Sequence, residues 1–307
     1  MSAAPRVQPE EFFTPEEWAA VSVRSRYAGL ALLLHCWAVI AAAMAVGVMW
    51  PITLPLVVMV VGGRQLGLFI LMHDAAHGLL HPNRRTNDWA AKWFGGAELN
   101  AYRPYHLQHH RFVQQTEDPD LVLSAPFPIT PASLKRKIWR DLSGQTFFKQ
   151  RISPLLVKLK SRDASQSAIS LIALEVKNQR VFLISNGVGF ALFAAAGLWW
   201  AWLLIWLLPM ATWLPLVTRL RNIAEHALVA ENNADPLRHA RTTQANFIER
   251  ALLAPYWVNY HGEHHMFTQI PCWNLPKAHR ILASKGITQR MEVQSSYPAV
   301  LRLAASA

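Results

Sequence analysis

Two long stretches without a charged residue constrain this chain more than any other feature. Residues 27–50 contain no Asp, Glu, Lys or Arg, and residues 181–218 continue for 38 positions without one. A helix needs roughly 20 apolar residues to cross a bilayer, so the first stretch is long enough for one span and the second for two. The alternative, a water-soluble protein in which these are core helices, is disfavoured because uncharged stretches of this length are hard to bury in any other way.

The expected spans form two hairpins. Between the uncharged stretches, residues 52–72 make a further span in which Arg64 and Gln65 are the only strongly polar side chains. The longer stretch is expected to break near Gly197, beside tryptophans of the kind that lie at membrane interfaces. The predicted fold class is therefore an all-α membrane protein with four transmembrane helices, at about residues 27–50, 52–72, 181–198 and 199–218.

The basic residues predict how these hairpins are oriented. The net charge is +11; residues 81–180 hold 16 lysines and arginines and residues 219–307 hold 10, whereas the two hairpin tips hold none. Because basic residues accumulate in cytoplasmic loops, we expect the N-terminal segment (1–26) and a helical cap (73–180 and 219–307) to be cytoplasmic. The cap and spans (27–307) form a single domain. No nucleic-acid partner is expected, because the basic residues lack a binding motif and interleaved aromatics; topology and anionic lipid explain the charge.

Nine of the thirteen histidines fall into four short clusters on the predicted cytoplasmic side. The clusters are His73 with His77; His106 with His109 and His110; His226; and His261 with His264 and His265. On a helix, positions i and i+4 share a face, so the pair in the first cluster can reach one ion. In each HxxHH cluster the outer histidines share a face, and the middle one is turned toward a neighbouring ion.

The number of histidines indicates a centre with two metal ions. Nine ligands exceed what one tetrahedral zinc needs and suit two ions of higher coordination number. Imidazole binds iron, zinc, copper and nickel, so the ligand type does not select the metal. The remaining histidines are not expected to be ligands: His35 is a packed polar residue within a span, and His239 and His279 are structural. His81 continues the spacing of the first cluster and has at most an auxiliary role.

The order HxxxH, HxxHH, HxxHH around membrane hairpins resembles the membrane fatty acid desaturase superfamily, which includes alkane hydroxylases and carotene hydroxylases and ketolases. The resemblance covers about residues 27–279, and it is closest to bacterial fatty acid desaturases. Asn222 and His226 match an NxxxH motif of acyl-CoA desaturases, in which the asparagine lies near one iron through water. The resemblance implies two Fe²⁺ ions held by the nine histidines, O2 as co-substrate and a location in the bacterial inner membrane.

This resemblance implies a desaturase that introduces a double bond into the acyl chain of a lipid. The alternative is a hydroxylase or ketolase of the same superfamily, acting on a carotenoid, a sphingolipid base or an alkane, because the histidine motifs are common to both. A non-enzymatic metal carrier is a more distant alternative, since a carrier is expected to place polar residues along its spans.

Acidic residues beside the ligands are expected to accept the second N–H of each imidazole and so orient it. These outer residues are Asp74, Glu225, Glu263, Asp118 and Asp120, together with Asn222. Arg103 and Arg111 flank the second cluster and either pair with these acids or meet an anionic head group. Cys36 and Cys272 form no CxxC cluster, and a His-Pro-Gly-Gly haem motif is missing. The electron donor is therefore expected to be a separate ferredoxin or cytochrome with its reductase.

Overall fold

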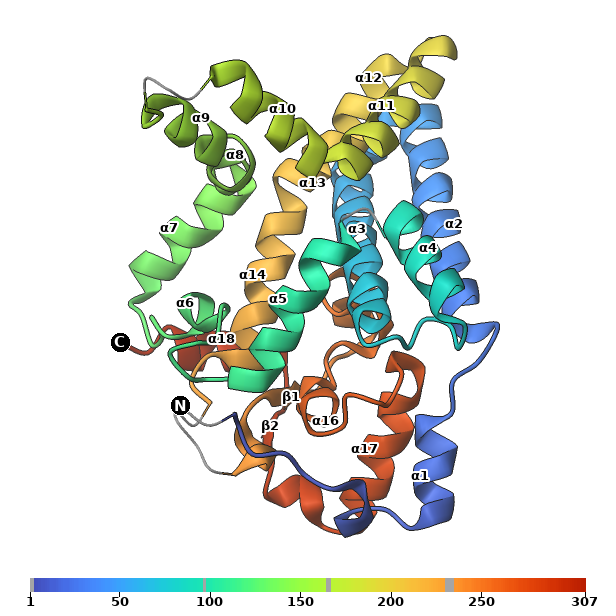
Figure 1. The fold of residues 1–307 in the computed structure, drawn as a ribbon, viewed down its shortest axis with the longest axis vertical. Helices are drawn as coiled ribbons and strands as arrows, with labels where there is room; N and C mark the ends of the chain where they lie inside the picture. Colours follow the sequence, from blue (N-terminus) through green and yellow to red (C-terminus); the bar gives the residue numbers. More distant parts are fainter. Residues whose placement is uncertain (1–2, 96–97, 164–166, 230–234) are drawn as a thin grey trace.

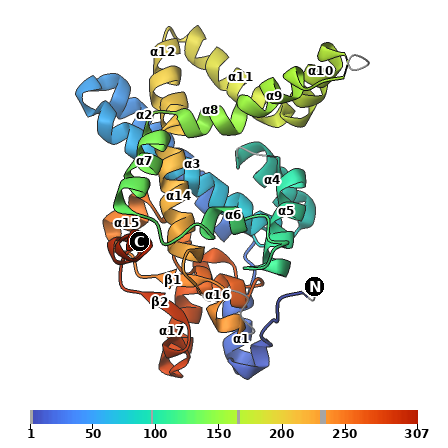
Figure 2. The same ribbon diagram turned by 90° about the vertical axis from the view of Figure 1, so that its left-hand side faces the viewer.

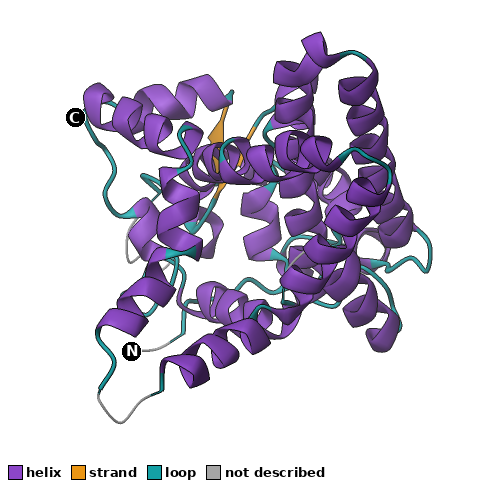
Figure 3. Ribbon diagram, turned by 90° about the horizontal axis from the view of Figure 1, so that it is seen from above, coloured by secondary structure: helices purple, strands orange, loops and turns teal. Residues whose placement is uncertain are grey.

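The computed structural model describes residues 3–95, 98–163, 167–229 and 235–307. The described chain is almost entirely helical, and long helices stand side by side above a cap of shorter ones (Figure 1). One parallel sheet is present in this part of the chain, formed by β1 (Arg241–Thr243) and β2 (Glu292–Gln294). Figure 3 shows how little strand the fold contains. The expectation of a mainly helical protein is confirmed.

The first hairpin consists of α2 (Ala28–Met49) and α3 (Leu54–Ala76), joined by a short turn of 3₁₀ helix, Pro51–Thr53. The buried residues of α2 recur at every third or fourth position, as one face of a helix requires. They are Gly29, Leu33, Cys36, Ile40, Met44 and Gly47. Apolar side chains such as Leu34, which is 72% exposed, cover much of the rest of α2. A helix with one packed face and a bare apolar surface suits contact with lipid.

The second hairpin turns at Gly197, whose φ of +73° is favourable for glycine. Before the turn lies α11 (Arg180–Ala195). After it the helix continues from Trp199 to His226 through α12 (Trp199–Ala201), the π-helical segment η3 (Trp202–Leu207), α13 (Leu208–Ala211) and α14 (Trp213–His226).

Three helices in the described residues are long and apolar enough to cross a membrane. They are Ala28–Met49, Pro51–Ala76 and Trp199–His226. The stretch expected to form the remaining span is the shorter apolar helix α11, which has 16 residues. A four-span arrangement therefore stays a prediction. The last two long helices also run beyond the expected span ends, at residues 72 and 218, and carry histidine clusters at their ends.

The cap is assembled from segments far apart in the sequence (Figures 1 and 2). Its helices are α1 (Pro15–Ser22), α4 (Arg84–Phe94), α5 (Leu99–Phe112), α6 (Leu121–Ser124), α15 (Phe247–Leu252), α16 (His261–Met266), α17 (Leu275–Ser284) and α18 (Tyr297–Ala304). The small sheet positions α16, because β1 also bridges to Tyr260, the residue just before that helix.

Four helices lead from the cap to the second hairpin. They are α7 (Pro131–Leu142), α8 (Gln145–Arg151), α9 (Ser153–Lys160) and α10 (Ala168–Asn178). In Figure 2, α8 to α10 extend to one side of the long helices. Near the start of this segment, the buried Asp141 of α7 accepts hydrogen bonds from Nε and Nη2 of Arg219 on α14, at 2.5 and 2.8 Å. This two-bond ion pair connects the segment α7–α10 to a long helix.

Close backbone packing at Gly29 gives a test of this fold. A Cβ atom on Gly29 would lie 2.1 Å from the carbonyl oxygen of Leu80, whereas nothing lies within 4 Å of a Cβ on Gly187 of α11. We expect Gly29→Ala to lower the free energy of unfolding by about 1–3 kcal/mol through overpacking. Gly187→Ala, the matched control, should stabilise the helix by about 0.5–1 kcal/mol. Thermal unfolding in detergent measures both; equal effects would show that α2 does not pack here.

Candidate metal centre

Four helix ends deliver the nine clustered histidines to one buried region. α3 contributes His73, and His77 is its C-cap; the glycine that follows, Gly78, has a φ of +76° that turns the chain away. α14 ends at His226. The other six histidines lie on α5 and α16, both in the cap. The two cap helices therefore meet the ends of two long helices, so the site lies where the spans and the cap join.

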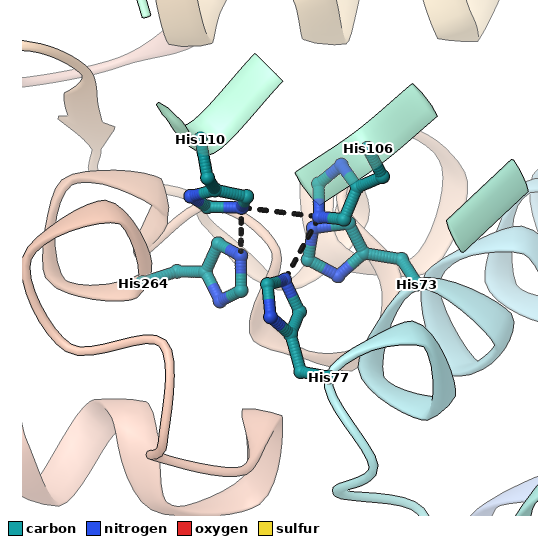
Figure 4. Close-up of side chains that lie close together, drawn as sticks. All are labelled: His73, His77, His106, His110 and His264. Atoms are coloured by element: carbon teal, nitrogen blue, oxygen red, sulfur yellow. Dashed lines mark hydrogen bonds between the residues drawn. The ribbon is translucent and has the colours of Figure 1, made fainter. Parts of the chain in front are cut away.

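Five of these histidines form a first group, which we call the five-histidine group. It consists of His73, His77, His106, His110 and His264, with one ring nitrogen of each within 4.8 Å of the others. The Nε2 atom of His106 lies 2.9 Å from that of His77 and 3.0 Å from that of His110. Nε2 of His264 lies 3.1 Å from Nε2 of His110. Figure 4 shows the five rings converging from three helices.

The remaining four form a second group, the four-histidine group: His109, His226, His261 and His265. Nε2 of His261 lies 2.9 Å from Nε2 of His226 and 3.1 Å from Nε2 of His265. The groups are adjacent, since the rings of His110 and His265 stack with centroids 4.2 Å apart. In both HxxHH clusters the outer histidines join one group and the middle histidine joins the other. This is the division that the helical spacing predicts.

The chemical state of these imidazoles suits metal binding. Burial lowers the pKa of the cap histidines in the two groups well below the usual value, and neighbouring imidazoles lower it further; the affected residues are His106, His110, His261, His264 and His265. The rings are therefore neutral, with a lone pair free to coordinate. Both ring nitrogens of His73 are buried without a hydrogen-bond partner. Unpartnered buried nitrogens are costly, and a metal ion in each group would satisfy those that face it.

Asp118 is the acid that orients a ligand as expected. Its Oδ1 atom lies 2.8 Å from Nδ1 of His109, and the same carboxylate accepts the backbone N–H groups of Gln114 and Asp120. Because the carboxylate holds Nδ1 of His109 in its protonated form, Nε2 is left with the lone pair that faces the four-histidine group. The imidazole is thus fixed in both tautomer and direction.

Two other expected acids lie beside ligands without such a hydrogen bond. Oε1 of Glu225 accepts a hydrogen bond of 2.6 Å from Arg221, and Oε2, buried and otherwise unpartnered, lies 3.4 Å from Nε2 of His261. This oxygen therefore faces the four-histidine group itself. Asp74 accepts the backbone N–H of Cys272 at 2.8 Å, and its other oxygen lies 3.7 Å from His73. The hydrogen bond between Asp74 and Cys272, the shorter of these two contacts, links α3 to the segment that follows α16.

Within the described part of the chain, the other three outer residues make no hydrogen bond to the imidazole of a clustered histidine. Asp120 accepts a hydrogen bond from Tyr105 and lies 3.8 Å from His109. Glu263 accepts from Thr242 and lies 2.5 Å from Nδ1 of His279. Glu263 follows His261 by two positions on α16, a rotation that turns it away from the ligand face. The half-buried side chain of Asn222 makes no hydrogen bond to the described residues.

The structure also gives supporting roles to residues outside the set of expected outer residues. His279 of α17 pairs with Glu263, which raises the pKa of His279, so this histidine helps to hold α16. Tyr102 stacks on His106, with ring centroids 5.3 Å apart. Arg103, expected to pair with one of the outer acids or to meet an anionic head group, instead donates to the carbonyl oxygens of Ala75 and Ala76 at the end of α3 and pairs with Asp88. Of these contacts, only the i, i+4 spacing of Tyr102 and His106 could have been noticed in advance.

A large apolar cavity, which the sequence did not locate, lies along α3. Its volume is about 700 Å³, and its walls come from α2, α3, α4, α11 and η3. Trp37, Phe69, Phe94 and Trp206 contribute rings to it. Phe69 precedes His73 by one turn of α3, so the cavity extends along the helix that carries a ligand of the five-histidine group.

Comparison with known proteins places the chain in a family. Residues 48–295 match the family described as "Fatty acid desaturase". Dihydrorhizobitoxine desaturase of Bradyrhizobium elkanii is 31% identical over 243 residues, which cover 74% of this chain and 67% of that protein. Beta-carotene ketolase of Paracoccus sp. (strain PC1) is 25% identical over 222 residues, covering 70% and 75%. Zeaxanthin 4-ketolase of Chlamydomonas reinhardtii is 25% identical over 227 residues, covering 70% and 41%.

The family match includes all four elements that carry the clustered histidines, and it agrees with the resemblance inferred from their motifs. The long apolar helices agree with the membrane location of such enzymes. The chain is a membrane oxidoreductase that belongs to the fatty acid desaturase family.

Proposed function

We propose that the protein is an O2-dependent di-iron desaturase that introduces a double bond into the acyl chain of a lipid. The five-histidine group would hold one iron and the four-histidine group the other. When bound, iron would supply the chemistry of O2 activation and one-electron transfer that removes hydrogen from an unactivated methylene. The protein supplies neutral imidazoles, a carboxylate that fixes the orientation of His109, and a water-poor surrounding for the substrate.

The observation that carries this proposal is the apolar cavity along α3, whose wall includes Phe69, one helical turn before His73. Its volume of about 700 Å³ lies in the range of small-molecule sites. The polar side chains that line it, apart from tryptophan, are Gln65, Arg151, Ser185 and Asn186. Nε2 of Gln65 donates to the carbonyl oxygen of Trp206 at 2.8 Å, and the Trp206 ring donates to Asn186 at 2.8 Å. A cavity with such walls favours a hydrocarbon chain. It opens among helices that face lipid, so an acyl chain can enter from the bilayer.

The position of the chain decides the product, because small displacements of reacting atoms change rates strongly. Removing hydrogen from two adjacent carbons gives an alkene, whereas returning oxygen to the first carbon gives an alcohol or, after further oxidation, a ketone. The desaturase relative is 31% identical and the ketolases 25%, which supports desaturation. The ketolase relatives make oxidation of a carotenoid the second candidate.

We also propose a membrane location and an electron donor for this enzyme. The distribution of lysine and arginine supports a cap on the cytoplasmic side of a bacterial inner membrane. Electrons would come from a separate ferredoxin or cytochrome, because the chain has only two cysteines and both are free and buried.

Product analysis tests the proposed reaction. The full chain is expressed in a host that lacks the activity, together with a ferredoxin and its reductase, and cellular lipids are profiled by mass spectrometry. We expect acyl chains that have lost two hydrogen atoms, and no such product from His261→Ala. A product that has gained oxygen instead would identify a hydroxylase or ketolase and contradict the desaturase proposal.

Metal analysis tests the assignment of the two groups. We expect two irons in the purified chain. His265→Ala and His264→Ala, which remove a ligand from the four- and five-histidine groups, should each lower the iron content to about one per chain. His81→Ala, outside both groups, is the control and should retain both ions. Two zinc ions in the wild type, with no turnover after iron loading, would rule out the proposed chemistry.

Filling the cavity tests the substrate site. Ser185 of α11 lines the cavity, whereas Ser170 of α10 is exposed and lies outside it. We expect Ser185→Trp to keep its iron but to lower turnover of long acyl chains at least about tenfold, because the indole occupies space that the chain needs. Ser170→Trp should behave as the wild type. Equal turnover by both variants would place the substrate elsewhere.

A further inference from the structure

A second groove lies on another face of the first hairpin. Its volume is about 590 Å³, and it is formed by α2, α3, α15 and the 3₁₀ segment η5 (Pro255–Trp257). Leu32 and Val39 of α2 line this groove, whereas Leu33 and Trp37 of the same helix line the large cavity. The two spaces therefore lie on different faces of α2, and this groove is separate from the proposed substrate site.

Arg64 of α3 places a buried positive charge in this groove. The residue is only 7% exposed, and no carboxylate in the described chain forms an ion pair with it. Its Nη2 atom donates to the carbonyl oxygens of Ala251 and Arg250 at the end of α15, at 2.5 and 3.5 Å. Nη2 makes both of these bonds, and the Tyr256 side chain is the other polar group close to the guanidinium. An unneutralised guanidinium within an apolar helix is costly unless it meets an anion.

The other polar side chains of the groove carry either a positive charge or an N–H or O–H donor. Arg250, which is exposed and has no acidic partner in the described residues, lines the groove together with His35 and Tyr256. Tyr256 donates to the carbonyl of Leu32, so its oxygen accepts from Nδ1 of His35 at 3.1 Å. The guanidinium carbon of Arg64 lies 5.6 Å from the centre of the Tyr256 ring. The lining therefore has positive charge and no negative charge.

The groove lies where the cap helix α15 packs against the first hairpin. A Cβ atom on Gly63, the neighbour of Arg64, would lie 2.9 Å from the carbonyl oxygen of Leu252 of α15. Figure 2 shows α15 where the long helices meet the cap. On α15, Phe247 and Ile248 are 77% and 66% exposed, as expected for side chains that enter a bilayer interface. The remaining walls are apolar and can contact acyl chains.

We propose that this groove binds an anionic phospholipid of the surrounding bilayer, with its phosphate between Arg64 and Arg250. A guanidinium offers paired donors that match phosphate oxygens, and the groove has no carboxylate to compete for them. The apolar walls hold the upper acyl chains. The lipid neutralises Arg64 and joins α2 and α3 to α15, without a part in the reaction.

Native mass spectrometry of the purified full chain tests this site. Phosphatidylglycerol is added to the protein in detergent, in parallel with phosphatidylcholine carrying the same acyl chains. We expect one phosphatidylglycerol to be retained in preference to phosphatidylcholine. Arg64→Gln and Arg250→Gln should each weaken its retention about tenfold, the loss expected for a charge-assisted hydrogen bond. Arg162→Gln, which alters an exposed arginine on the segment after α9, should leave retention unchanged.

Two controls distinguish the proposed lipid site from unfolding of a variant and from binding of free phosphate. Arg64 is buried, so if Arg64→Gln elutes as an unfolded protein, the exposed Arg250→Gln decides the outcome. Iron content is measured in parallel, because loss of iron with normal lipid retention concerns the metal centre alone. Equal retention of the two lipids, unchanged retention in Arg250→Gln, or displacement of the lipid by millimolar inorganic phosphate would overturn the proposal.

Discussion

The convergence of nine imidazoles, most of them buried, is the constraint on which the rest of this structure depends. Nitrogen atoms of different rings lie 2.9–3.3 Å apart in two groups, and those of His73 have no hydrogen-bond partner. Such an arrangement is unfavourable in an apolar interior unless the lone pairs are used together, and it requires four helix ends to be held in register. Asp118, Arg103 and the pair of Glu263 with His279 hold these ends, which explains why the cap contains most of the buried polar contacts.

The same helices that are long enough to span the membrane also carry metal ligands. α3 and the segments of Trp199–His226 lead from the apolar layer to the centre. Under the proposed function, a hydrocarbon chain lying along α3 would approach the five-histidine group at the end of that helix. The π-helical segment η3 contributes Trp202 and Trp206 to the cavity wall, and irregular helix geometry of this kind often accompanies functional sites.

The first hairpin separates two spaces of different character. One side faces a cavity lined mostly by apolar and aromatic side chains, with Arg151 as its charged residue, which suits a hydrocarbon chain. The other faces a groove with Arg64, Arg250 and no acid, which suits an anionic head group. Because these lie on different sides of α2, the proposed lipid and the proposed substrate would not compete for one space.

The sequence by itself determined the long apolar helices, the identity of the nine clustered histidines and their division into two groups. All of these follow from local rules: span length, and the 3.6-residue period that sets His109 apart from His106 and His110. Tertiary structure alone decided which acids reach an imidazole, that His279 supports Glu263, and where the cavity and the cationic groove lie. Those features depend on side chains from distant segments meeting in space, and no local period encodes such contacts. Arg64 shows the difference: the sequence marks it as unusual within a span, but only the packing of α15 against α3 shows what surrounds it.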